Sequence, residues 1–451
     1  MEWELIQTRL NALLDAGRHN ELRGALMMLN VVDIAIYLSE LETDRMLKVF
    51  RILPKDISAD VFSYMDDDQR RKLIESIGDK EIGALIGDMF IDDAVDFLEE
   101  MPASLVKHVL SNVDEEQRKI INRFLKYPEY SAGSIMTIEF CDFHAGTTVM
   151  EAMKVLKKTG VDKETIYTLY VIDAQRKLIG TVPLRKLILA DDDMPIENLM
   201  NVNYVCATTT DDQEYVADLV RKYDLTSIPI VDKENRLVGI VTIDDIMDVL
   251  EEEATEDIEK MNALLPSEDE YMKTSVLRLA GNRLPWLMFM MISGIFTGLI
   301  IIYFEGVLTS LPAVGVALTA CIPMLMGTGG NCGSQASTLA IRGLAVGELE
   351  PKDAAKVLWK EFRVAAIVSV ALALINLLIQ LFVFGRGIYV ALTVSLAMIC
   401  TVLLSKSIGC TLPMLAKKMK LDPALMAAPL ITTIVDACSL LILFAFATII
   451  L

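Results

Sequence analysis

Histidine is scarce in this chain, and cysteine occurs without paired spacing. The three histidines, His19, His108 and His144, all lie in the first third of the sequence. The seven cysteines include no Cys-X-X-Cys pair, and five of them follow residue 320 in apolar segments. Zinc sites are usually built from clustered His and Cys ligands, so the sequence argues against one. The odd number of thiols instead indicates free cysteines in a reducing compartment.

Positive charge is also in short supply. The 42 Lys and Arg face 62 Asp and Glu, which gives a formal net charge of −20. Residues 281–451 hold 11 Lys and Arg against 7 Asp and Glu, and residues 1–280 hold 31 against 55. The first part therefore has a net charge of −24. Such a surface repels phosphate, which excludes a nucleic-acid-binding protein.

Apolar residues are concentrated in the C-terminal part. The mean hydropathy of the 451 residues is +0.42 and 53% of them are hydrophobic, which excludes an ordinary soluble globular protein. The length alone suggests about three domains. A membrane-spanning helix needs roughly 20 apolar residues. The long uncharged runs predict five spans, at about 284–304, 311–335, 357–384, 387–415 and 423–450.

The charges that flank these spans predict their orientation. The chain opens with an acidic Met1-Glu-Trp-Glu4, unlike a secretory signal peptide, so we expect a cytosolic N-terminus. The outer loops then hold only Glu305 and Arg386. The inner flanks hold Arg278, Arg283, Arg342, Lys352, Lys356, Lys360, Arg363, Lys417, Lys418 and Lys420. This positive-inside pattern predicts a multi-pass protein of the cell membrane with Leu451 outside.

A glycine-rich segment, residues 323–335, ends the second predicted span. Its four glycines, one proline and two amides predict an interrupted helix. At membrane depth, irregular backbone is tolerated only inside protein or against a water-filled cavity. The alternative is a glycine-packed contact between helices. Asn331 and Gln335 count against that alternative, because their amides need polar partners.

Asp436 is a carboxylate inside the fifth predicted span. Placing such a group inside a membrane costs free energy, so its presence there indicates a functional role. Thr432, Thr433 and Ser439 add oxygens on the same helix, and Pro429 frees a backbone carbonyl. Oxygen ligands suit a hard cation such as Mg²⁺ or Ca²⁺. The alternative is a structural ion pair with Lys406 of the fourth span.

Residues 1–133 have a helical pattern throughout. Similar apolar triplets recur at Ala35/Leu38/Leu41, Ala59/Phe62/Met65 and Ala94/Phe97/Met101, and each is followed by a turn and a second helix. This imperfect repeat predicts a stack of helix pairs, with an ordinary helical bundle as the alternative.

Residues 134–250 contain an internal duplication. Residues 169–173, 178–180 and 187 match residues 228–232, 237–239 and 246 at an offset of 59. Each copy, at 134–200 and 201–250, reads as strand, charged turn, strand and helix. The pattern resembles a tandem pair of CBS domains, a module known for binding adenosine nucleotides or ions and for pairing into dimers. Arg185-Lys186 stands where the second copy has Asp244-Asp245, which favours an ion sensor.

An acidic helix is predicted to follow and to lead into a connecting segment at 251–280. Asp245, Asp248 and Glu252 share one face at three- and four-residue spacing. An adjoining face carries Glu253, Glu256 and Asp257. Like charges so spaced repel unless they are neutralised, so this helix is either a solvated linker or one that needs cations to dock. Further carboxylates are Asp92, Asp96, Asp212, Glu214 and Asp224.

The order of these parts resembles the MgtE family of magnesium channels along essentially the whole chain. The resemblance rests on residues 251–258, 323–335, 341–345 and 421–425, and on Asp436. It implies an all-α helical-repeat N-terminal module, an α/β tandem CBS pair, a connecting helix and a five-helix transmembrane domain at 281–451. It also implies a homodimer with the pore between two membrane domains.

The resemblance further implies roles for individual residues. Asp436 would hold a hydrated Mg²⁺, and the pore would be lined by Gly329, Gly330, Asn331, Thr432 and Ser439. The acidic helix would plug the cytosolic mouth when Mg²⁺ binds to a sensor. The sensor would consist of Asp92, Asp96, Asp212, Glu214, Asp224, Asp245, Asp248, Glu253, Glu256 and Asp257. Two departures from the family pattern are Ala428, where the family often has asparagine, and Lys406 in the fourth span.

The sequence therefore predicts uptake of Mg²⁺ driven by the membrane potential, with closure by cytosolic Mg²⁺. The potential supplies about 2.3 kcal/mol per charge per 100 mV. No GxxxxGK[ST] motif and no nucleophile–base pair occurs, so an enzyme is not expected. One alternative is a cation exporter or exchanger that uses Lys406 and Asp436 as a protonatable pair. Another is a membrane-bound ion or nucleotide sensor that transports nothing.

Overall fold

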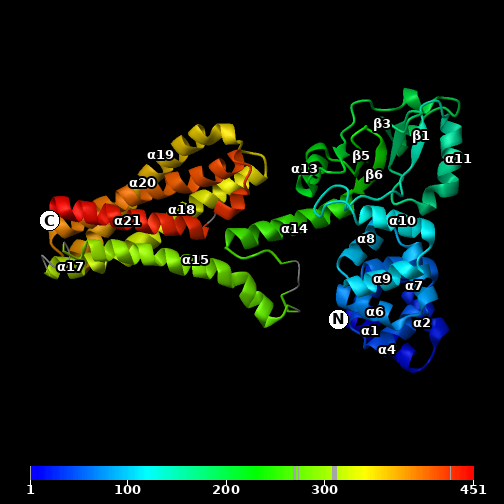
Figure 1. Ribbon diagram of the computed structural model, residues 1–451, viewed down its shortest axis with the longest axis horizontal. Coiled ribbons are helices and arrows are strands. Elements are labelled where there is room, and N and C mark those ends of the chain that lie inside the picture. Colours follow the sequence, from blue (N-terminus) through cyan, green and yellow to red (C-terminus); the bar gives the residue numbers. More distant parts are fainter. Residues whose placement is uncertain (1, 268–270, 273, 307–311, 427) are drawn as a thin grey trace. The chain divides into compact units, whose positions relative to one another are not determined.

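The computed structural model describes residues 2–267, 271–272, 274–306, 312–426 and 428–451. The chain folds into two compact units, Met1–Leu250 and Glu251–Leu451. Figure 1 shows the helices and strands of both.

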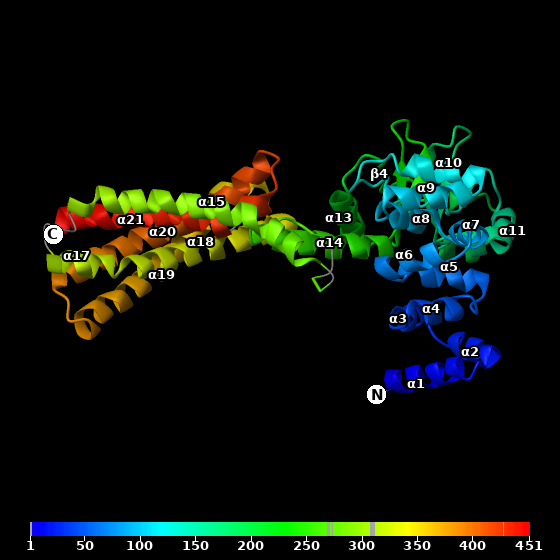
Figure 2. The same ribbon diagram turned by 60° about the horizontal axis from the view of Figure 1, so that its bottom comes forward.

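The first unit begins with a stack of short helices, as the apolar repeat predicts. Helices α3, α5, α7 and α9 pack on one another in succession, and Figure 2 shows the helix pairs as layers. Side chains 30 residues apart join neighbouring pairs: Arg51 binds Glu81 at 3.0 Å and Ser63 donates to Asp93 at 2.9 Å. The helices are α1 (Glu2–Asp15), α2 (His19–Leu26), α3 (Val31–Ser39), α4 (Thr43–Phe50), α5 (Lys55–Ser63), α6 (Asp67–Ser76), α7 (Asp79–Asp88), α8 (Ile91–Glu99), α9 (Ala103–Asn112) and α10 (Glu115–Phe124).

Two similar α/β repeats complete this unit. The described residues form the sheets β1–β2–β3 and β4–β5–β6, each with one parallel and one antiparallel pair. The register shifts at Val171/Ile172 and again at Ile230/Val231, which is the offset of 59. The elements are β1 (Asp142–His144), α11 (Val149–Thr159), η1 (Gly160–Asp162), β2 (Thr168–Ile172), β3 (Leu178–Pro183), α12 (Leu184–Ile188), η2 (Ile196–Asn198), β4 (Ala207–Thr208), α13 (Gln213–Tyr223), β5 (Ser227–Val231), β6 (Leu237–Thr242) and α14 (Ile243–Met261).

A continuous apolar core joins the helical stack to the second repeat. Buried Val95 and Phe97 of α8 belong to the same cluster as Ile228 of β5 and Ile246 of α14. Burying such side chains is the main stabilising term in folding. The core therefore holds α8 near the start of α14, and the carboxylates of both helices come with it.

The second unit consists of long apolar helices. Within the described residues, five helical segments are long and apolar enough to cross a membrane, which confirms the predicted number. The first span begins earlier than predicted and the second ends later; the predicted start of the second, residue 311, lies outside the described residues. The elements are α15 (Val276–Tyr303), α17 (Pro312–Thr319), α18 (Ile322–Ala345), η3 (Pro351–Asp353), α19 (Ala354–Leu378), the π-turn η4 (Ile379–Val383), α20 (Ile388–Lys418), η5 (Pro423–Met426) and α21 (Ala428–Ile450).

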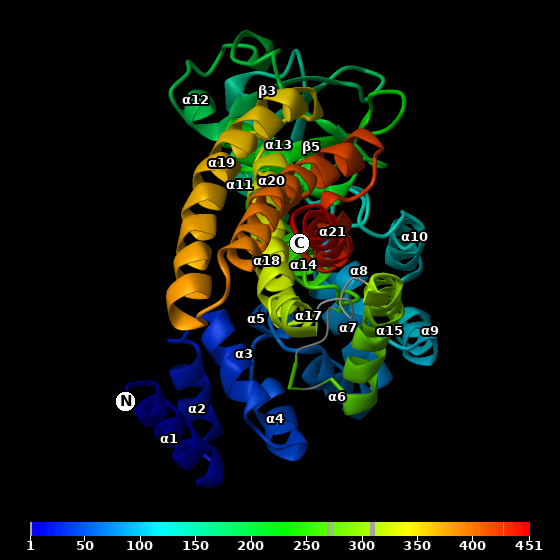
Figure 3. The same ribbon diagram turned by 90° about the vertical axis from the view of Figure 1, so that its left-hand side faces the viewer.

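Helices α18, α20 and α21 pack against one another at the centre of this unit. The end-on view of Figure 3 shows α19 outside α20 and α15 on the side of α21. Buried Leu325, Val394 and Phe444 come from the three central helices and meet in one apolar core.

The prediction of an interrupted helix at residues 323–335 was wrong. The segment lies within the continuous helix α18. A Cβ at Gly329 would lie 2.7 Å from Cγ2 of Thr401 and 2.9 Å from Cγ1 of Val435. A Cβ at Gly333 would lie 2.7 Å from side chains of Ile431 and Ser405. The glycines therefore let α20 and α21 approach closely, which is the glycine-packed alternative.

Candidate functional site

One face of α18 is polar and exposed within the described chain. Gly327, Asn331, Gln335, Thr338 and Arg342 are exposed and recur every three or four residues. This spacing places them on one side of the helix. The opposite side carries the glycines that pack against α20 and α21. Helix α18 thus combines a tight apolar contact with a polar stripe in a segment long enough to cross a membrane.

Asp436 projects from α21, the helix that packs against α18. Its side chain is half-buried, and among the described residues no side chain hydrogen bonds to it or pairs with it. Its neighbours on the helix serve packing: Val435 and Ser439 lie against Gly329. A carboxylate without a protein partner in an apolar helix is available to a cation.

The other predicted pore residues occupy two different environments. Gly329, Gly330 and Ser439 are buried in the helix contacts, whereas Asn331 is exposed. The Ser439 hydroxyl donates to the carbonyl of Val435 at 2.6 Å. The Thr432 and Thr433 hydroxyls both donate to the carbonyl of Pro429 at 3.0 Å. Pro429 lies in the first turn of α21, where a missing N–H costs no helical hydrogen bond. The side chain of Ala428, the departure from the family pattern noted above, lies outside the part of the chain that the structure describes.

Lys406 pairs with Glu361 and not with Asp436. The Lys406 side chain is 6% exposed, and its Nζ lies 3.5 Å from Oε2 of Glu361, which is 14% exposed. The pair joins α20 to α19. The structural alternative for Asp436, an ion pair with Lys406, is therefore wrong.

This pair yields a first prediction, on stability. In Lys406→Met the Glu361 carboxylate stays buried without its cation, so we expect a loss of about 3–5 kcal/mol in the free energy of unfolding. The double variant Lys406→Met/Glu361→Met removes both charges and should recover most of the loss. Denaturation of the purified proteins measures both effects. Equal stability of the single variant and the wild type would contradict a stabilising pair.

Acidic side chains from both parts of the first unit gather between α8 and the start of α14. We call this group the acidic cluster; its members are Asp92, Asp93, Asp96, Glu164, Asp244, Asp245 and Asp248. Burial and the neighbouring Asp245 raise the pKa of Asp92 well above its usual range. Burial, with Asp244 and Asp245 nearby, raises the pKa of Glu164 to about 8. The partly buried members Asp92, Asp93, Glu164 and Asp245 therefore repel one another with reduced screening by water, whereas Asp96, Asp244 and Asp248 are exposed.

Local hydrogen bonds hold several of these carboxylates in place. The Asp245 carboxylate accepts from the backbone N–H and the hydroxyl of Thr242 at the start of α14. Burial nevertheless raises the pKa of Asp245 to about 7, and these hydrogen bonds only oppose the increase. Asp93 accepts from Ser63 at 2.9 Å. Asp245 and Asp93 are held in position by these bonds, so rotation of these two side chains does not readily relieve the repulsion.

The structure brings together only some of the predicted sensor residues. Asp92, Asp96, Asp245 and Asp248 belong to the acidic cluster. Asp212 instead caps the N-terminus of α13 by accepting from the N–H of Glu214, and Asp224 ends that helix with a φ of 49°. Asp93, Asp244 and Glu164 belong to the cluster but were not among the predicted sensor residues, although Asp244 was noted as part of the acidic pair that favours an ion sensor. The first two adjoin predicted residues, but no pattern in the sequence points to Glu164.

The later turns of α14 belong to the second unit and carry a second polar group. Glu253, Glu256, Asp257 and Lys260 share its half-buried face. Lys260 Nζ lies 2.7 Å from Glu256 and 2.8 Å from Asp422, just before η5. Partial burial opposes the charged form of Lys260, but the hydrogen bonds that its ammonium donates to Asp422 and Glu256 outweigh burial and raise the pKa of Lys260. The end of α14 is thus tied to the connection that leads into α21, a contact that the sequence analysis missed.

The acidic groups suit a hydrated ion better than a bare one. In the part of the chain that the structure describes, no three Asp, Glu, His or Cys side chains converge as a ready-made ligand set. Mg²⁺ keeps several of its waters and binds through one or two carboxylates. The oxygen-only donors of the acidic cluster therefore fit hydrated Mg²⁺ and disfavour a transition metal.

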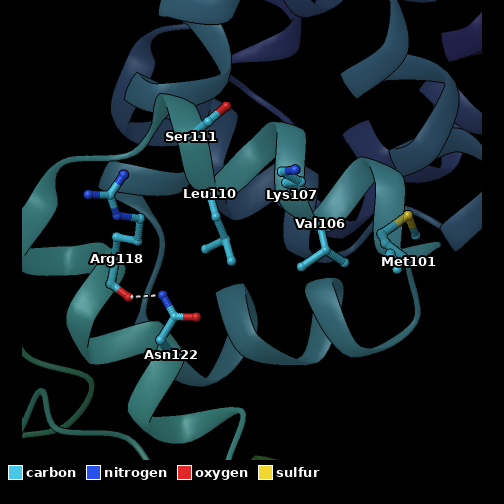
Figure 4. A pocket seen from close by; sticks show the side chains of 8 residues that line it. Met101, Val106, Lys107, Leu110, Ser111, Arg118 and Asn122 are labelled. Carbon is cyan, nitrogen blue, oxygen red and sulfur yellow. Dashed lines mark hydrogen bonds between the residues drawn. The ribbon is translucent and has the colours of Figure 1, made fainter.

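A hollow on the helical stack has a different character. It lies between α9 and α10, where Val106, Leu110 and Met101 point inward (Figure 4). The charged residues that line it are the cations Lys107 and Arg118. It therefore does not contribute to a cation site.

Comparison with known proteins matches all parts of the chain. A family model described as a divalent cation transporter matches residues 322–446, an MgtE intracellular N domain matches 29–130, and a CBS domain matches 196–252. The magnesium transporter MgtE of Thermus thermophilus is 33% identical over 99% of both chains, and that of Bacillus subtilis is 32% identical over 99% of this chain and 98% of its own.

Solved structures match about half of the chain. The cytosolic domain of the Mg²⁺ channel MgtE in complex with ATP is 33% identical, with a TM-score of 0.51 over 54% of this chain and 99% of that one. Some more distant relatives are enzymes, and these match only the region of the CBS repeats.

Proposed function

The chain belongs to the MgtE family of divalent cation transporters, and we propose that it is a homodimeric channel through which Mg²⁺ enters the cell. The observation that carries the proposal is Asp436 of α21, which has no side-chain partner among the described residues; α21 packs against α18, whose other side carries the exposed polar face. Exposing these groups to lipid would leave an unsolvated carboxylate and unsatisfied amides. A second copy of the chain that faces the same surface, with water between the two, removes that cost.

In this arrangement the two Asp436 carboxylates would hold one hydrated Mg²⁺. Mg²⁺ gives up its waters reluctantly, so a wide polar site is easier to build than a dehydrating filter. Asn331 and Gln335 would hydrogen bond to the ion's waters, and the buried glycines would fix the helices behind them. The membrane potential would drive entry, with the N-terminus in the cytosol and Leu451 outside.

We further propose that cytosolic Mg²⁺ closes the channel through the acidic cluster and α14. A bound ion would neutralise carboxylates from α8 and from the start of α14 together. The later turns of the same helix carry Glu253, Glu256 and Asp257 and the ion pair from Lys260 to Asp422. Ions that favour a closed form must bind that form more tightly. Carboxylates that hold a mostly hydrated ion bind weakly, which suits millimolar cytosolic Mg²⁺.

The CBS pair is the proposed site for an adenine nucleotide. Its support is the ATP bound to the cytosolic domain of the similar Mg²⁺ channel and the presence of both repeats here. Equilibrium dialysis of the purified protein against ATP tests this proposal, and absence of saturable binding would reject it.

Transport assays separate the proposed channel from its alternatives. In proteoliposomes, Mg²⁺ uptake should follow an imposed voltage and ignore a proton gradient. Uptake that follows the proton gradient would indicate an exchanger. The Lys406–Asp436 pair considered for an exchanger is not formed, because Lys406 pairs with Glu361. A protein that moves no Mg²⁺ under either gradient would be a sensor.

The raised pKa values give a second prediction, on pH. The folded cluster binds protons that the unfolded chain has already released, because Asp245 and Glu164 have pKa values of about 7 and about 8. The metal-free protein should therefore lose stability as the pH rises from about 5 to about 8. Millimolar Mg²⁺ should reduce the loss by replacing the protons. Thermal unfolding with chelator and with Mg²⁺ measures this, and identical pH profiles would contradict it.

A further inference from the structure

Arg70 is a buried cation that faces the acidic cluster from α6. Its side chain is 8% exposed, and the guanidinium lies 5.7 Å from the centre of the Phe97 ring. Its Nη2 pairs with Asp67 and, at 2.9 Å, with Glu100. Its Nη1 lies 3.7 Å from Oδ2 of Asp96. Arg70 Nε is buried and has no hydrogen-bond partner among the described residues.

Asp96 thus stands between a fixed cation and the other carboxylates. Arg70 lies on one side of it, and Asp248 of α14 adds repulsion from another. One guanidinium serves the three carboxylates Asp67, Asp96 and Glu100, so it neutralises them only in part. The contact with Asp96 is the longest of the three, and the Asp96 side chain is 69% exposed. Asp96 can therefore turn from Arg70 toward an ion in the cluster.

We propose that Arg70 is a tethered cation that competes with Mg²⁺ for Asp96 and thereby sets the Mg²⁺ concentration at which the acidic cluster is occupied. This inference rests on the proposed regulation by cytosolic Mg²⁺. Arg70 lowers the affinity of the acidic cluster for Mg²⁺ in two ways. It repels an incoming divalent ion, and it stabilises Asp96 in the ion-free state. Both weaken Mg²⁺ binding and keep the sensor from saturating at low Mg²⁺.

The experiment is a Mg²⁺ titration of the full chain in detergent, followed by protease protection near residues 130 and 260. Arg70→Gln should lower the Mg²⁺ concentration at half-protection about five- to tenfold. Arg70→Lys keeps the charge and should stay near the wild type. Arg51→Gln is the matched control, because Arg51 binds Glu81 across the same 30-residue spacing and both side chains are about half exposed. It should leave the titration unchanged.

A double variant distinguishes competition for Asp96 from a structural role. If Arg70 acts mainly through Asp96, Arg70→Gln should cause a much smaller shift in an Asp96→Asn background, because only its repulsion of the ion remains to be lost. A purely structural role would lower stability and shift the titration there as much as it does in the wild type. An unchanged or higher half-protection concentration in folded Arg70→Gln overturns the inference and leaves the proposed regulation standing. A wild-type chain that Mg²⁺ does not protect overturns both. If Arg70→Gln fails to fold, Arg70→Lys provides the test. A Mg²⁺ concentration at half-protection close to that of the wild type supports the inference. A shift in that concentration as large as the shift caused by Asp96→Asn overturns it.

Discussion

Replacing Asp436 with alanine is expected to reduce Mg²⁺ flux by about 100-fold or more while the protein stays folded. Asp436 is the only acidic residue of α21, and among the described residues it has no protein partner to lose. The substitution therefore removes the attraction for a divalent ion without stranding another charge. Within the membrane-spanning helix α21 that attraction is the main one available to the ion.

Mg²⁺ uptake into proteoliposomes at a fixed inside-negative voltage measures the effect. Asp436→Asn keeps the size of the side chain and should lose flux to a similar degree, because charge is the property that counts. Asp353→Asn is the matched control. Asp353 is an acidic residue of the same unit, lies just before α19, and pairs with Lys356 in the first turn of that helix. It should transport like the wild type. Wild-type flux from Asp436→Ala would show that the ion path lies elsewhere.

Neutralising the acidic helix should produce a channel that stays open at high cytosolic Mg²⁺. In Asp245→Asn/Asp248→Asn/Glu253→Gln, both the repulsion and the bridging by ions are lost. Loss of bridging should dominate, because closure requires an energetic difference that depends on Mg²⁺. We expect the closing concentration to rise by at least about tenfold, since a coupling of this kind is typically worth 1–3 kcal/mol.

The matched control removes the same charge from another surface. Asp191, Asp192 and Asp193 are three exposed carboxylates in the first α/β repeat. Their replacement by asparagine should leave the closing concentration unchanged. Closure of the acidic-helix variant at the wild-type Mg²⁺ concentration would mean that α14 is a solvated linker.

The features that could be predicted from the sequence depend on local patterns. Uncharged runs gave the number of spans, and the duplicated strands appear with the same offset in the sheet registers. The glycine-rich part of α18 could not be predicted in this way. A missing Cβ permits either irregular backbone or close approach of another helix. Only the positions of Thr401, Val435 and Ile431 show which one applies.

The candidate sites were predictable only in part for the same reason. Asp92 and Asp245 are 153 positions apart, and only the resemblance to a known family placed them in one sensor. The folding of the first α/β repeat brings Glu164 to them, and no regular spacing in the sequence indicates this contact. The partner of Lys406 is likewise a contact between α19 and α20, so its ion pair with Glu361 was not predictable from the sequence.

The most direct test of the account is current recording from inside-out patches that contain the wild-type chain, with Mg²⁺ varied on the cytosolic face. We expect a Mg²⁺ current that depends on voltage, is independent of a proton gradient, and falls reversibly as cytosolic Mg²⁺ enters the millimolar range. A Mg²⁺ current that persists unchanged at high cytosolic Mg²⁺, or no current at any Mg²⁺ concentration, would contradict it.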